Sequence, residues 1–167
     1  KDKNGNHAVF TPFALPCNIN FEAMQEEGYK RYLYETLPVT YEKLSELQYY
    51  AYNGAWELWQ EGIEKGIMAP QFHGREHLNL SVFDNLLNRK DKELIFSLDN
   101  RSYISLKRHS LDPRGWTAAF DTLPGEEFDH FDRILSDGAS SFEEVFGFKS
   151  VSFTPPAQKF PSSKLMA

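Results

Sequence analysis

Three short apolar runs, rich in residues that favour strands, set the main constraint on how this chain can fold. They span residues 7–16, 67–72 and 150–153, and glycine or proline flanks each of them. Runs of this kind are typical of buried strands. Segments with helical periodicity lie between them, so the order is strand, helices, strand, helices, strand. This alternation predicts an α/β fold with a mostly parallel sheet.

Local signals predict several helices between the apolar runs. The clearest covers residues 41–65, with Thr40 as N-cap, apolar residues three or four apart, and Gly66 as C-cap. A capping-box pattern of Ser81 and Asp84 predicts a helix that continues to residue 89. Residues 128–135 predict another helix, which Gly138 interrupts, and a short helix follows over 141–147. A helical turn is expected at 21–27, and residues 92–98 fit either a helix or a strand.

The composition excludes several classes of function. The chain has 18 basic and 24 acidic residues and a net charge of −6, whereas a nucleic-acid-binding surface normally shows as a basic patch. No apolar run approaches the ~18 residues of a membrane-spanning helix. Cys17 is the single cysteine, which excludes an internal disulfide and a multi-cysteine zinc site. The high aromatic content, 15% of the chain, fits a well-filled core and equally fits surfaces that stack on sugars.

The domain organisation is expected to be simple. The 167 residues suit one domain, and no linker divides them. The chain begins at Lys1 without an initiator methionine and stops at Ala167, just after an apparent helix start. We therefore expect residues 1–167 to be a fragment of a larger domain, truncated at both ends.

Two histidines four residues apart, His73 and His77, are the sharpest chemical signal. Two imidazoles at this spacing can converge on one metal ion, although one core and one surface histidine would give the same pattern. The segment His73-x-x-Glu76-His77 also matches a metallopeptidase motif in which a helix presents both histidines and the glutamate acts as base. Pro70 and Gly74 oppose a helix here. The alternative places the pair at the carboxyl end of a strand, where α/β folds build their sites.

The second position agrees with a family resemblance. Residues 59–77 resemble the polysaccharide deacetylases, in which a helix ends in glycine, a short strand follows, and an H-x-x-x-H motif supplies two zinc ligands. Residues 5–11 resemble an earlier strand of that family, and residues 146–157 resemble its Phe-Arg-x-Pro-x-Gly motif. The chain departs from the family pattern at three positions: Gly74 replaces serine or threonine, Thr154 replaces arginine and Ala157 replaces glycine.

The resemblance implies a part of a (β/α) barrel with mostly parallel strands and surrounding helices. It implies a divalent metal, zinc, bound by His73, His77 and an aspartate upstream of Lys1. A second upstream aspartate would act as the base, and a histidine beyond Ala167 as the acid. Thr154 and Pro155 fall in the motif expected beside the substrate, and Arg75 is a candidate contact to sugar hydroxyls or the acetyl oxygen, unless it pairs with a carboxylate instead.

The expected activity is removal of acetyl groups from an acetylated carbohydrate by a metal-dependent hydrolase. Because the segments for the base and the acid are missing, we expect residues 1–167 alone to bind metal weakly and to be inactive. Two alternatives remain open at this point. One is a non-catalytic module of deacetylase type that binds a glycan or a protein partner; the other is the metallopeptidase that uses His73, Glu76 and His77.

Overall fold

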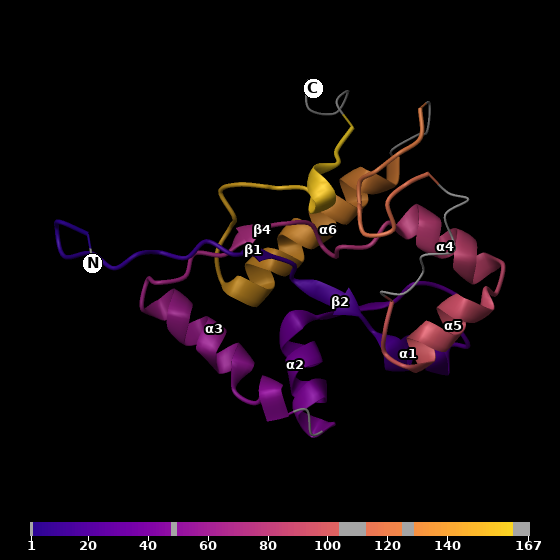
Figure 1. Ribbon diagram of the computed structural model, residues 1–167, viewed down its shortest axis with the longest axis horizontal. Helices are drawn as coiled ribbons and strands as arrows, with labels where there is room; N and C mark the ends of the chain where they lie inside the picture. Colours follow the sequence, from indigo (N-terminus) through magenta and orange to yellow (C-terminus); the bar gives the residue numbers. More distant parts are fainter. Residues whose placement is uncertain (1, 48–49, 104–112, 125–128, 162–167) are drawn as a thin grey trace.

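The computed structural model describes residues 2–47, 50–103, 113–124 and 129–161, and it has a mixed α/β fold (Figure 1). The elements within these residues, in chain order, are β1 (Phe13–Ala14), β2 (Cys17–Ile19), α1 (Phe21–Glu26), β3 (Tyr34–Thr36), α2 (Leu37–Glu46), the 3₁₀ helix η1 (Tyr50–Tyr52), α3 (Ala55–Glu64), β4 (Gln71–Phe72), α4 (Leu80–Asn88), α5 (Lys92–Asp99), α6 (Asp129–Phe146) and the 3₁₀ helix η2 (Pro156–Gln158).

The three apolar runs lie side by side and parallel, as their alternation with helices predicts. Strand β1 pairs in parallel with β4, with Phe13 opposite Gln71 and Ala14 opposite Phe72. Isolated parallel bridges extend this arrangement from residue 10 to Met68 and from Phe72 to Phe153. The regular strands are shorter than expected, because prolines at positions 12, 16 and 70 cannot donate hydrogen bonds to a ladder. A parallel sheet of two strands is therefore what the described residues contain, and the barrel itself stays a prediction.

A second, antiparallel pair was not predicted. Strand β2 pairs with β3, and Asn18 lies opposite Glu35. Glu35 is buried, and it is stabilised by an ion pair with Lys43 and by a hydrogen bond of 2.9 Å from the Thr40 hydroxyl. These contacts attach α2 to the strand pair. They also show that Thr40 is not an N-cap but lies inside a helix that begins at Leu37.

The single long helix predicted over residues 41–65 is wrong. The chain instead forms α2, the 3₁₀ helix η1 and α3, and α3 begins after Gly54. The apolar spacing continues across both helices, which is why it suggested one element. Trp56 and Trp59 of α3 pack against Phe146 of α6, with ring centres 5.8 and 5.7 Å apart, so these two aromatics contribute to the core.

Helix α6 runs without a break through Gly138, contrary to the predicted interruption. A Cβ atom at this position would lie 2.9 Å from Cβ of Arg75 and 2.9 Å from Cζ of Phe72. Glycine is therefore present because α6 crosses very close to β4 and the loop that follows it (Figure 1). The short helix predicted over 141–147 is the last part of α6, and residue 128, the predicted helix start, lies outside the described residues.

Helix α4 begins two residues earlier than the capping-box pattern indicates. Its N-cap is Asn79, whose side-chain oxygen accepts a hydrogen bond of 3.2 Å from the backbone N–H of Val82. Residues 92–98, left open between helix and strand, belong to α5. Helices α4 and α5 pack on α1 around a core of leucine, phenylalanine and methionine side chains. No helix in the described residues is both long and apolar enough to cross a membrane.

Candidate metal site

The loop that carries the histidine pair begins where β4 ends. His73 directly follows Phe72, and its backbone N–H donates a hydrogen bond of 3.1 Å to the carbonyl of Ala14, the last residue of β1. The backbone N–H of Thr154 donates one of 3.2 Å to the carbonyl of Phe72. The carboxyl ends of three parallel segments therefore meet at His73, which is the location predicted for the pair.

The imidazole of His73 is held in one orientation. Its Nδ1 lies 2.6 Å from the carbonyl oxygen of Thr154, and because a carbonyl only accepts, Nδ1 donates. The lone pair is then on Nε2, as in metal-binding histidines whose other nitrogen donates to a backbone carbonyl. Burial lowers the pKa of His73 and outweighs the hydrogen bond to Thr154, which raises it. The neutral, metal-binding form is therefore favoured.

The ring of His77 lies next to that of His73. Their centres are 5.2 Å apart and their planes are inclined by 58°. Zinc–nitrogen bonds of about 2.0 Å, with each ring centre about 1.1 Å beyond its nitrogen, place two ligating imidazoles about 5 Å apart at the tetrahedral angle. Among the described residues, neither Nε2 of His73 nor either ring nitrogen of His77 has a hydrogen-bond partner. The spacing of the two ring centres is therefore compatible with two ligands of one metal ion.

The described residues supply two donors of this kind and no more. No group of three or more histidine, cysteine, aspartate or glutamate side chains that could hold a metal ion occurs within them. A catalytic zinc takes three protein ligands and a water molecule. The arrangement is thus part of a metal site, which needs at least one further donor.

Glu76 and Arg75 lie on the inner side of the loop, away from this role. Nε of Arg75 lies 2.7 Å from a carboxylate oxygen of Glu76, and both side chains are buried. The guanidinium also lies over the ring of Tyr34, 4.2 Å from its centre, and Tyr32 donates a hydrogen bond of 3.2 Å to Glu76. Burial raises the pKa of Glu76, and the neighbouring Arg75 opposes that shift. The pair is a buried support for the loop, and a substrate contact for Arg75 stays a prediction.

The peptidase alternative requires one helix through both histidines. Residues 73–79 are instead irregular, and the next helix, α4, starts at Leu80. The carboxylate of Glu76, which would be the base, is paired with Arg75. The geometry on which that alternative depends is therefore not found here.

Gly74 has a positive φ of 105°, a conformation that side chains disfavour. A Cβ there would also lie 3.4 Å from both Phe120 and Pro156. These distances are ordinary van der Waals contacts, so it is the positive φ that disfavours a serine or threonine after His73. Pro155, which leads into η2, is half-buried like Thr154, and Ala157 adopts a φ of 54° at the position where that family has glycine.

Gln71 fixes the third parallel segment against β4. Its side-chain oxygen accepts hydrogen bonds of 3.0 Å from the backbone N–H groups of Val151 and Ser152. The hydroxyl of Ser150 in turn accepts one of 2.8 Å from the backbone N–H of Phe72. These bonds lie two to four residues before Thr154, so they set which carbonyl faces His73.

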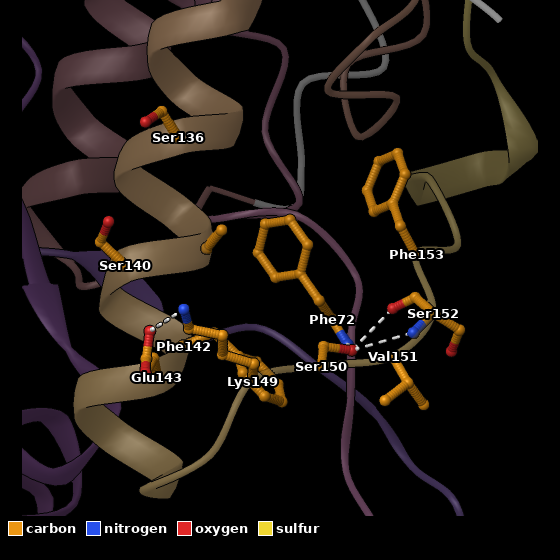
Figure 2. Close-up of a pocket in the computed structure, with 11 residues that line it drawn as sticks. Phe72, Ser136, Ser140, Phe142, Glu143, Lys149, Ser150, Val151, Ser152 and Phe153 are labelled. Carbon is orange, nitrogen blue, oxygen red and sulfur yellow. Dashed lines mark hydrogen bonds and ion pairs between the residues drawn. The ribbon is translucent and has the colours of Figure 1, made fainter.

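A groove of about 560 Å³ lies between α6 and residues 149–153. Figure 2 shows Ser136 and Ser140 of α6 along one side and residues 150–153 along the other, with Phe72 between them. Lys149 and Glu143 approach within 3.9 Å across it. Neither histidine of the pair lines this groove, although Phe72 and Phe153, which directly precede His73 and Thr154, do.

Sequence reasoning missed one residue of the site, Phe13, which stacks on His73. Asn79, expected as a helix cap or turn residue, is confirmed as the N-cap of α4, and its side-chain amide also donates hydrogen bonds to the carbonyls of Ala118 and Asp121. The signal for Phe13 was its place on the strand that should neighbour the one ending at His73. Cys17 is buried, and burial raises its pKa to about 11, which makes it a poor nucleophile.

Comparisons with known proteins do not indicate a family or a function for this chain, so the functional argument depends on the geometry of the site. No family model, no curated protein and no solved structure matches the chain.

Proposed function

We propose that this chain belongs to a metal-dependent hydrolase of polysaccharide-deacetylase type, which removes acetyl groups from an acetylated carbohydrate. The observation that carries the proposal is the pair of neighbouring imidazoles at the carboxyl end of β4, 5.2 Å apart between ring centres. The hydrogen bond from His73 to the Thr154 carbonyl adds support, because it leaves the metal-binding nitrogen free.

The strand order supports a (β/α) barrel as the parent architecture. The run that contains β1, the run that contains β4 and the segment at Phe153 are neighbours in the same order as in the chain, and all are parallel. Helices separate them in the sequence. Barrels of this kind place their sites at the carboxyl ends of the strands, which is where the histidine pair lies.

In the proposed reaction, this chain's residues hold the site in place. His73 and His77 present two neutral nitrogen donors, and the Thr154 carbonyl keeps His73 in the required tautomer. The buried pair of Arg75 and Glu76 supports the loop from within. Zinc, when bound, would lower the pKa of a bound water to about 7 and polarise the acetyl carbonyl. The remaining donor comes from outside the described residues.

Metal titration tests the proposal directly. Zinc and cobalt affinities are measured calorimetrically for the unmodified chain, His73→Ala, His77→Ala and the control His7→Ala, which changes an exposed histidine of the N-terminal segment. We expect each of the first two variants to lose at least about tenfold in affinity, and the control to be unchanged. Equal binding by all four would refute the metal site.

Acetate release decides between hydrolase and binding module. With two donors in the described residues, we expect this chain alone to show metal binding without turnover on acetylated chito-oligosaccharides. The same two-donor count favours, as a second candidate, a non-catalytic module that binds glycan. Acetate release that depends on His73 and His77, from the chain extended at both ends, would support the hydrolase; glycan binding by that longer chain without release would support the module.

A further inference from the structure

Phe13 occupies an unusual place for a large apolar side chain. It belongs to β1, yet 59% of it is exposed. Its ring stacks on the imidazole of His73, with ring centres 5.4 Å apart and planes inclined by only 18°. The side chain therefore contributes little to the core and covers one face of a candidate metal ligand.

The stack supplies a constraint that the hydrogen bonds of His73 do not. The backbone N–H of His73 is bonded to Ala14, and Nδ1 is bonded to Thr154. A hydrogen bond at Nδ1 fixes the position of one ring atom, but the ring can still rock about the N–H···O direction. A nearly parallel aromatic ring offset against one face limits that rocking, because the stacking contact is lost when the planes tilt. The direction of the Nε2 lone pair depends on this plane.

We propose that Phe13 is a positioning residue for the metal site, which acts by holding the plane of the His73 imidazole. This inference rests on the proposed function in one respect, namely that His73 binds the metal. Residues that orient a ligating histidine typically contribute 10- to 100-fold to metal affinity, and a stacking contact belongs to the lower end, about tenfold.

The chain offers a matched control for Phe13. Phe10 lies in the same apolar run, is 65% exposed, and is joined to Met68 by a backbone bridge much as Phe13 is joined to Gln71. Among the described residues, Phe10 has no ring contact with a histidine. Truncation of either ring leaves no buried cavity, so neither variant should unfold the chain.

The experiment measures zinc and cobalt affinity and the thermal unfolding midpoint for the unmodified chain, Phe13→Ala, Phe13→Tyr and Phe10→Ala. We expect Phe13→Ala to bind cobalt about tenfold more weakly with an altered visible spectrum, at an unfolding midpoint equal to that of Phe10→Ala. Phe13→Tyr keeps the ring and should restore both affinity and spectrum. NMR of the metal-free chain adds a second measurement, since stacking on Phe13 shifts the His73 ring protons upfield and Phe13→Ala should abolish that shift.

Two results would overturn the inference alone. One is equal metal affinity for Phe13→Ala and Phe10→Ala in a chain that binds metal; the other is a Phe13→Tyr variant as weak as Phe13→Ala. If the unmodified chain binds no metal, the proposed function fails and this inference fails with it, so the two failures are distinguishable.

Discussion

Replacement of Gly138 by alanine tests how tightly α6 is packed behind the histidine loop. Two opposing effects decide whether the substitution raises or lowers the free energy of unfolding. Alanine is favoured over glycine inside a helix by about 1 kcal/mol. Against this, the new Cβ would lie 2.9 Å from Cβ of Arg75, 2.9 Å from Cζ of Phe72 and 3.0 Å from the backbone nitrogen of Arg75.

The packing penalty should exceed the gain in helix propensity. Overpacking of a well-filled site typically costs about 1–3 kcal/mol, and the upper part of that range applies when the neighbours cannot move. One neighbouring atom here is backbone, and the Arg75 side chain is held by Glu76 and by the ring of Tyr34. A penalty of about 2–3 kcal/mol less the helix gain gives a net loss of about 1–2 kcal/mol. For a chain of this size that is a fall of roughly 2–8 °C in the unfolding midpoint.

The assay is thermal and urea unfolding of Gly138→Ala beside Ser140→Ala, an exposed position of the same helix. Ser140→Ala should be neutral or stabilising by up to about 0.5 kcal/mol, because only helix propensity changes there. Should Gly138→Ala prove as stable as Ser140→Ala or more so, the close approach of α6 to Arg75 and the reason given for the glycine would both be refuted.

Three further predictions concern stability. Asn79→Ala should cost about 2–4 kcal/mol in urea unfolding, against about 1 kcal/mol for the half-buried cap control Asp91→Ala, because Asn79 also donates hydrogen bonds of 3.0 Å to the carbonyls of Ala118 and Asp121; equal costs for the two variants would contradict this role of the Asn79 amide. Ala157→Gly should raise the free energy of unfolding by about 0.5–1 kcal/mol, since alanine there has a φ of 54°; a loss of stability would contradict the strain. Burial raises the pKa of Cys17 to about 11 from an ordinary value of 9.0. The contribution of the neutral thiol to the free energy of unfolding is therefore fully present below pH 9 and is lost as the pH rises towards 11. The stability of the unmodified chain should therefore fall more steeply over that interval than that of Cys17→Ala, and parallel curves would contradict it.

The parallel neighbours were predictable because each of the three runs is apolar, bounded by glycine or proline, and separated from the next by helical segments. The site followed from the same pattern, since His73 directly succeeds one run. What failed depends on contacts between distant residues. The pair of β2 and β3 is three residues long on each side and carries a buried glutamate, Glu35, which is stabilised by Lys43 and Thr40.

Local patterns also misled where two elements share one periodicity. The apolar spacing over residues 41–65 is continuous although α2 and α3 are separate helices. Gly138 was interpreted as a helix breaker because its close neighbours, Phe72 and Arg75, are more than sixty residues away in the chain. The stack of Phe13 on His73 required the register of β1 against β4, which no local signal contains.

The side-chain amide of Gln71 has a consequence for how the connection after α6 can vary. Because its oxygen binds the backbone of Val151 and Ser152, the carbonyl that faces His73 is selected from within β4 and not by the length of the preceding turn. Extra residues inserted at 147–149 should therefore bulge outwards and leave the contact between His73 and Thr154 in place. Gln71 thus allows that turn to lengthen or shorten while the geometry of the histidine is preserved.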